Sequence, residues 1–274
     1  MVKLQDNLKK IETYKNSSPH YKELLDIYGD ILILREDFRC RMKKAVFNIE
    51  EAHIDKKLSG GLPLVDLSQG NLDLSEAQAY FIELMRIAEK INSEESQAIL
   101  ADLKKGKILF NNMVEETFDK QSESNAEEED DSFDLLGFFV EESLRPAFEQ
   151  IAERYAEKIS KSKWCEGYCP VCGKEPNIGE IREEEGKRFL FCSQCGTEWN
   201  FRRIKCPFCG NEEQKTLSYF TVEEDERYRV DVCDRCKRYI KTIDFRSMKE
   251  EPNLDIEDIT TIHLDMLANE EGYN

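Results

Sequence analysis

The fold is decided by four Cys-x-x-Cys motifs, which read CPVCG (169–173), FCSQCGTEW (191–199), KCPFCG (205–210) and VCDRCK (232–237). The motifs are separated by 19, 10 and 23 residues. A two-residue gap lets both sulfurs of one motif reach a single ion at about 2.3 Å, and two motifs complete a tetrahedron. Pairing motifs that are neighbours in sequence therefore predicts two metal sites, one formed by Cys169, Cys172, Cys192 and Cys195 and the other by Cys206, Cys209, Cys233 and Cys236.

The segments between the motifs are typical of β-hairpins. Residues 177–182 and 187–191 flank one turn, and residues 217–222 and 228–232 flank another. Three motifs are followed by glycine, whose freedom to adopt a positive φ would let the chain bend around a metal, and the fourth is followed by Lys237. We expect two hairpins of the zinc-ribbon or rubredoxin type, each closed by one ion. Zinc and iron both accept four thiolates, so the spacing leaves the metal open.

The remainder of the chain has the composition and spacing of helices. Of the 274 residues only 13 are Gly and 7 are Pro, while 35% are charged. Apolar residues recur at helical steps within residues 19–47, 75–91, 93–106, 108–118 and 133–161. A loop is expected over 58–73, followed by a capping box formed by Ser75 and Gln78, and Pro146 should bend or restart its helix. A short helix around 259–267 should pack against the helical body, with residues 270–274 frayed.

These patterns predict an α+β protein, in which an all-helical N-terminal domain precedes two tandem rubredoxin-like or zinc-ribbon metal modules and a short C-terminal helix. The expected boundaries are 1–163 for the helical domain with an acidic loop at 121–132, 164–205 and 206–246 for the modules, and 247–274 for the C-terminal segment. Because metal-binding energy is folding energy in such modules, losing Cys172 should unfold the first module and leave the helical half largely intact.

The charge distribution bears on possible partners. The formal net charge is −18, which makes general attraction to nucleic acid the weaker expectation. Residues 122–134 are strongly acidic and are predicted to form a solvated linker or exposed loop, with an acidic docking strip as the alternative. Two small basic clusters, Arg202, Arg203 and Lys205, and Lys237, Arg238 and Lys241, have Trp199, Phe201 and Tyr239 interleaved. They form either a solvated face or a docking face for protein or nucleic acid.

Several classes of protein lose support. Residues 1–18 lack the apolar stretch of a signal peptide, and the longest apolar run, 135–140, is far shorter than the ~20 residues that cross a bilayer. A cytoplasmic location is therefore expected, where the ten cysteines stay reduced. His20, His53 and His263 are scattered, and hydrolase, phosphate-loop and dinucleotide motifs are missing from the sequence. Cys40 and Cys165 are taken as ordinary cysteines.

The motifs, with the residues around them, resemble the formate dehydrogenase accessory protein FdhE family. The resemblance is carried by the CPVCG motif after a long helix, by FCSQCGTEW continued as RIKCPFC (203–209), and by VCDRC followed by YIKT (239–242). It extends to the GLPL loop (61–64), to TIHLDMLA (261–268) and to EGY (271–273), so that the blocks follow the family order. Asn200 stands where family members often have His. The resemblance therefore implies no role for this position that needs an imidazole.

The resemblance implies a cytoplasmic, non-enzymatic protein that holds two iron or zinc ions and binds the catalytic subunit of formate dehydrogenase during its maturation. From the net charge and the short apolar runs, neither a nucleic-acid partner nor membrane insertion is expected. We expect the partner to contact Trp199, Arg202, Arg203 and Lys205, because a metal-locked hairpin is a preorganised surface and Trp and Arg are enriched at interface hot spots. The alternatives are a nucleic-acid-binding zinc-ribbon protein and a rubredoxin-like electron carrier.

Overall fold

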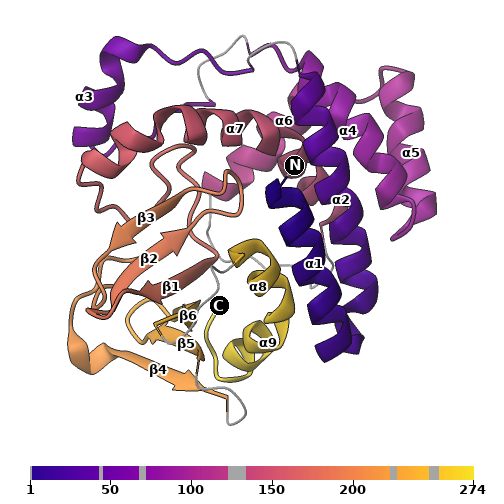
Figure 1. Ribbon diagram of the computed structural model, residues 1–274. Coiled ribbons are helices and arrows are strands. Elements are labelled where there is room, and N and C mark those ends of the chain that lie inside the picture. Colours follow the sequence, from indigo (N-terminus) through magenta and orange to yellow (C-terminus); the bar gives the residue numbers. More distant parts are fainter. Residues whose placement is uncertain (1, 43–45, 68–71, 123–133, 223–226, 247–252) are drawn as a thin grey trace.

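A computed structural model describes residues 2–42, 46–67, 72–122, 134–222, 227–246 and 253–274. Helices form one side of the molecule and a β-sheet the other, with two C-terminal helices between them (Figure 1). The N-terminal helices are α1 (Val2–Ser17), α2 (Lys22–Arg41), α3 (Ile54–Ser59), α4 (Ser75–Ala88), α5 (Ser93–Lys104), α6 (Phe110–Ser122) and α7 (Leu135–Lys161), with short 3-10 turns at Pro19–Tyr21 and Glu51–His53.

Helix α7 is the centre of the helical body. Its fully buried side chains Phe139, Leu144 and Phe148 belong to the same hydrophobic cluster as Tyr80 and Phe81 of α4. Asp134 caps its N-terminus by accepting the Gly137 N–H at 2.8 Å. The helix is continuous through the buried Pro146, so the predicted restart does not occur.

Three details of the helical prediction are wrong. Helix α1 was not expected, although Leu4, Leu8 and Ile11 carry the helical spacing and pack in the cluster that holds α1, α2 and α8 together. The helix predicted over 19–47 is limited to α2 (Lys22–Arg41), with a 3-10 turn at Pro19–Tyr21 before it. Ser75 is inside α4 rather than capping it, and its hydroxyl donates to Asp73. Asn92 caps α5 by accepting the Glu95 N–H.

Both cysteine modules contribute to one six-stranded sheet. Its strands are β1 (Ile178–Arg182), β2 (Lys187–Phe191), β3 (Glu198–Phe201), β4 (Leu217–Thr221), β5 (Tyr228–Cys233) and β6 (Arg238–Asp244), in the order β3-β2-β1-β6-β5-β4. Neighbours are antiparallel except β1 and β6, which pair in parallel with Ile178 opposite Lys241. The predicted hairpins are β1–β2 and β4–β5; β3 and β6 were not predicted, and the β1–β6 pair joins the modules into one sheet.

The C-terminal segment forms α8 (Leu254–Thr260) and α9 (Ile262–Glu270). The helix predicted around 259–267 coincides mainly with α9, and its predicted packing on the helical body is wrong. The helix that packs on the helical body, through Ile256, is α8, which the sequence does not predict. Helix α9 instead packs on the sheet, where Leu264 and Ala268 contact Val230 and Val232.

The prediction that residues 270–274 are frayed is wrong. The Asn274 N–H donates to Lys237 O at 2.8 Å, and Asn274 O accepts the Tyr239 N–H at 3.3 Å. The Tyr273 hydroxyl lies 3.1 Å from Asp234 Oδ1. This segment therefore covers the turn after the fourth motif.

Within the described part of the chain no helix has both the length and the apolar character needed to cross a membrane. Most of the acidic run at 122–134 lies outside the described residues. The predicted division into domains stays a prediction, because a continuous sheet does not by itself mark where one module ends.

Candidate metal centres

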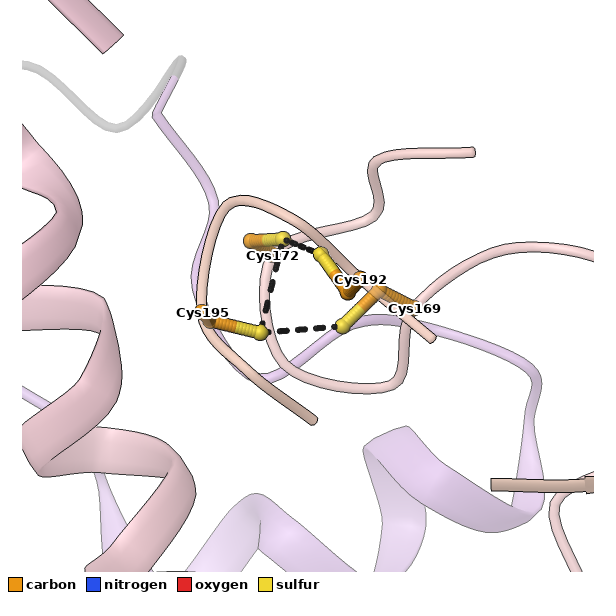
Figure 2. Close-up of side chains that lie close together, drawn as sticks. All are labelled: Cys169, Cys172, Cys192 and Cys195. Carbon is orange, nitrogen blue, oxygen red and sulfur yellow. Dashed lines mark hydrogen bonds between the residues drawn. The ribbon is translucent and has the colours of Figure 1, made fainter. Parts of the chain in front are cut away.

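The first group of four sulfurs joins the first two motifs, as the sequence predicts. Cys169 and Cys172 come from one loop and Cys192 and Cys195 from a second loop facing it (Figure 2). The Sγ atoms of Cys169 and Cys195 are 3.4 Å apart, those of Cys172 and Cys192 are 3.4 Å apart, and those of Cys172 and Cys195 are 4.0 Å apart. Cys169, Cys192 and Cys195 are at most 2% exposed. We call this group the first centre.

The second group joins the third and fourth motifs and is called the second centre. Cys206 Sγ is 3.7 Å from Cys236 Sγ, and Cys209 Sγ is 3.7 Å from Cys233 Sγ. Cys206 and Cys233 are buried, whereas Cys209 is at the surface. The second centre is therefore more open to solvent than the first.

Each motif closes in the same tight turn. The residue after the second cysteine has a positive φ in all four, namely 80° at Gly173, 66° at Gly196, 69° at Gly210 and 58° at Lys237. Its N–H donates to the carbonyl of the first cysteine at 2.8–3.1 Å. The turn also directs backbone N–H groups toward sulfur, as where Val171 N lies 3.4 Å from Cys169 Sγ. Such donors stabilise a thiolate in place of water.

The thiols of each group differ in acidity. Burial raises the pKa of Cys172 and of Cys195. Burial opposes ionisation of Cys192 too, but contacts with the neighbouring sulfurs hold its pKa well below the usual value. In the second centre, burial raises the pKa of Cys233, but hydrogen bonds from the Cys236 N–H and the Asn211 amide outweigh burial. The pKa of Cys233 is therefore lowered to about 7. Cys192 and Cys233 thus ionise readily, whereas burial disfavours ionisation of Cys172 and Cys195, and a bound metal ion would offset this effect.

The geometry fits four-thiolate metal binding. Metal–sulfur bonds of about 2.3 Å in a tetrahedron place the sulfurs about 3.8 Å apart, close to the separations in both centres. Disulfide sulfurs would be about 2.05 Å apart, and all ten cysteines are free. Four protein ligands leave no open position, which is typical of structural rather than catalytic sites. Zinc and iron fit this donor set equally well.

The first centre is held directly by the helical body. In the GLPL loop, Leu64 N donates to Pro170 O and Val65 N to Val171 O, both at 2.9 Å. From α7, the Glu141 carbonyl accepts the Gln194 side-chain amide at 2.8 Å. Cys169, Cys192 and Cys195 belong to the same hydrophobic cluster as α4 and α7. The first centre therefore forms part of the contact between sheet and helices.

The second centre is tied to the first by tight contacts. A Cβ on Gly167 would lie 1.8 Å from Pro207 O, so only glycine fits where the chain entering the first motif meets the third. The Arg238 guanidinium lies 3.7 Å from the centroid of the Phe208 ring and pairs with Glu175 at 2.6 Å. These contacts set the relative position of the two centres.

The residues predicted to dock a partner are only partly at the surface. Arg202 and Arg203 are exposed, and Lys205 is partly exposed with its Nζ 5.7 Å from the Phe201 ring centroid. Arg202 pairs with Glu212 at 3.0 Å. Trp199, in contrast, is 3% exposed and donates its indole N–H to Glu166 O at 3.0 Å. Its indole therefore packs inside the protein, because alternation along β3 turns it toward the core.

Other residues have roles that the sequence did not reveal. Asn211 donates from its side-chain amide to Cys233 Sγ at 3.5 Å, and the spacing of the motifs gives no sign of this contact. The backbone pairing of the GLPL loop was also missed, because a stretch without periodicity predicts only a loop. Cys40 and Cys165 are exposed and lie outside both centres.

Two family models match the cysteine region. The model described as FdhE, central domain, matches residues 168–203, and the model described as FdhE, C-terminal domain, matches residues 204–274. The chain is 36% identical over 114 residues to the protein FdhE homolog of Pseudomonas aeruginosa. This aligned region covers 38% of this chain and 36% of that protein.

A solved structure has the same fold. The crystal structure of the FdhE protein from Pseudomonas aeruginosa superposes with a TM-score of 0.70 at 19% identity, covering 98% of this chain and 91% of that chain. The protein FdhE homolog of Aquifex aeolicus is 30% identical over 273 residues, covering 97% of this chain and 90% of that protein. Since this identity extends over nearly the whole of both proteins, the chain belongs to the FdhE family.

Proposed function

We propose that this protein is a cytoplasmic accessory factor for the maturation of formate dehydrogenase, which binds the catalytic subunit and turns over no substrate itself. Membership of the FdhE family supports this role. The structural observation that carries it is the pair of four-sulfur centres in one sheet, because closed centres make a rigid surface and leave no position for a substrate.

Each centre binds one metal ion in this proposal. The ligands are Cys169, Cys172, Cys192 and Cys195 in the first centre and Cys206, Cys209, Cys233 and Cys236 in the second. A bound ion would stabilise the fold, and iron would in addition carry one electron.

Metal analysis of protein purified without oxygen tests these sites. We expect two ions per chain, with Cys172→Ala and Cys209→Ala each losing one and Cys165→Ala, an exposed cysteine outside both centres, retaining both. Elemental analysis distinguishes iron from zinc. If iron is bound, a visible absorption band should appear when the protein is oxidised with ferricyanide and bleach when it is reduced with dithionite. Unchanged metal content in Cys172→Ala would contradict the first site.

The partner-binding face is proposed to be formed by Arg202, Arg203 and Lys205, next to the third motif. Ile204, between them, is 51% exposed and provides apolar contact area in place of the buried Trp199. The neighbouring second centre fixes the backbone of this segment, so docking costs little conformational entropy.

Retention of the formate dehydrogenase catalytic subunit on the immobilised protein tests this face. Replacing Arg202, Arg203 and Lys205 with Ser should weaken retention and lower formate dehydrogenase activity in cells, with metal content and helical signal preserved. Deleting residues 122–132 should leave retention intact. The reverse pattern, normal binding by the triple variant and loss of binding by the deletion, would move the docking site to the acidic segment.

A further inference from the structure

A cavity of about 320 Å³ lies beside the second centre, bounded by strands of both modules and by the loop before the third motif. Cys206 and Cys233 form part of its wall. Its charged lining residues are five cations and one carboxylate, namely Arg188, Arg203, Lys205, Arg229, Arg238 and Asp231. We call it the basic cavity.

The positive charge of the basic cavity is only partly compensated. Arg238 pairs with Glu175, and Lys205 lies 3.8 Å from Glu212. Arg229 and Arg188 share a single carboxylate, Asp231, at 3.0 and 3.5 Å respectively. Among the described residues no carboxylate lies within ion-pair distance of Arg203. Counting these side chains alone, about two positive charges are in excess, which matches either the dianion of a phosphate monoester or the negative charge of a metal-loaded second centre.

Arg188 is the most unusual of these groups. It is 3% exposed, and its Nη1 donates to Lys205 O at 3.2 Å. Its Nε and Nη2 have no hydrogen-bond acceptor among the described residues, sulfur atoms included. Burial lowers the pKa of Arg188, and Asp231 offsets this only in part. A buried guanidinium with N–H groups that lack acceptors destabilises the folded protein. An anion bound in the adjacent cavity would reduce this destabilisation through its negative charge.

Apolar side chains complete the lining. Leu217 and Tyr219 belong to β4, and Tyr219 is 61% exposed at the edge of the cavity. The Arg229 guanidinium lies 5.0 Å from the centroid of the Tyr219 ring. Guanidinium groups bind phosphate and stack on flat rings. A lining that mixes cations with apolar surface suits a ligand that has both an anionic and an apolar part.

We propose that the basic cavity binds a small organic phosphate, with the phosphate near Arg188, Arg203 and Lys205 and the apolar part against Leu217 and Tyr219. This site adjoins the second centre, because Cys206 and Cys233 line it, and it includes Arg203 and Lys205 of the proposed partner-binding face. Binding of a small molecule to the isolated protein tests it independently of the role in formate dehydrogenase maturation. The competing explanation is that the cations only neutralise the negative charge of a metal–tetrathiolate centre.

Calorimetry on the full chain, with both centres loaded with metal, tests the ligand class. Four probes separate the need for a phosphate dianion from the need for an apolar ring. Phenyl phosphate has both groups and inorganic phosphate has only the anion. Benzoate has the ring with a single charge, and phenol has only the ring. Phenyl phosphate should bind at least about tenfold more tightly than the other three, and added salt should weaken its binding. Equal binding of phenyl phosphate and phenol, or none of either at millimolar concentration, would overturn the proposal.

Matched variants then test the location. The double variant Arg203→Gln, Lys205→Gln should weaken phenyl phosphate binding at least about tenfold, and Tyr219→Ala should weaken phenyl phosphate more than inorganic phosphate. Arg202→Gln is the control, because Arg202 adjoins these residues but does not line the cavity. If phenyl phosphate does not bind and the double variant instead loses metal from the second centre, the cations serve only to neutralise that centre.

Discussion

Lys237 occupies the one cysteine turn in which a residue other than glycine takes a positive φ. Left-handed backbone costs an ordinary residue about 1–2 kcal/mol, and glycine avoids this cost. Lys237 adopts this conformation where its N–H donates to Cys233 O and its carbonyl accepts the Asn274 N–H. The turn geometry is therefore maintained even where the sequence lacks glycine.

At Gly196 the cost of this conformation can be measured by itself. A Cβ there would meet nothing within 4 Å, and φ is 66°. Gly196→Ala should therefore lower the free energy of unfolding of the metal-loaded protein by about 1 kcal/mol, measured by urea titration. Gly196→Asn is the control and should lose less, because Asn tolerates the left-handed region. Equal loss in both variants would point to a steric cause instead.

At the scale of elements, α7 connects α2 and α8 through buried ion pairs. Arg35 of α2 makes two hydrogen bonds of 2.7 Å to Glu142, and Arg145 bonds to Asp255 of α8 at 2.5 Å. Glu149 lies among three guanidinium groups, those of Arg35, Arg39 and Arg145. These contacts position the C-terminal helices that cover the sheet.

Glu149 should give the protein a measurable acid sensitivity. Burial opposes its ionisation, but Arg145, Arg35 and Arg39 outweigh burial and hold the pKa of Glu149 below its usual 4.5. A lowered folded-state pKa contributes stability that is complete above pH 4.5 and is lost as the pH falls through the folded-state value.

Urea unfolding at several pH values tests this contribution. Glu149→Gln should lower the free energy of unfolding by about 3–5 kcal/mol at neutral pH. The difference in free energy of unfolding between the variant and the unaltered protein should become smaller below about pH 4.5. Glu153→Gln, one turn further along α7, is the control, because Glu153 is 63% exposed and its pair with Arg39 should contribute about 1 kcal/mol or less. A difference that is constant with pH would show that the charge of Glu149 does not matter.

At the scale of the whole molecule, the two centres differ in what they support. The sulfurs of the first centre belong to the cluster shared with the helical body, and the GLPL loop pairs with its backbone. Cys233 of the second centre ends β5, whose Val230 and Val232 pack with α9 in a separate cluster. Loss of the first metal should therefore disturb the helices, in contrast to the expectation from sequence that the helical half stays largely intact.

Hydrogen exchange on two cysteine variants compares these effects. Cys172→Ala should lose the first metal and reduce protection in residues 61–65 and in α7. Cys209→Ala should lose the second metal and reduce protection in β4 and β5, with α4 and α7 unchanged. Identical protection of the helices in both variants would mean that the first centre does not stabilise the contact with the helical body.

Local chemistry accounts for what could be predicted about the site. The two-residue gaps within the motifs and the glycines after three of them are short-range features, and they suffice to pair Cys169 with Cys195 and Cys209 with Cys233 in the right groups. The helical spacing in α4 and α7 is equally local. Trp199 shows where prediction from residue type fails. Tryptophan is common at interfaces, but the position of Trp199 in β3 buries it inside the protein.

The α+β class, the helical N-terminal half, the two groups of four cysteines and the family can all be predicted from sequence, since each depends on spacing within short segments. The sheet shared by the two modules through β1 and β6, the covering of that sheet by α9 and the burial of Arg188 beside the basic cavity cannot be predicted in this way. These features depend on contacts between residues far apart in the chain, where several pairings satisfy the same local pattern. Packing and burial of the whole chain select one of them.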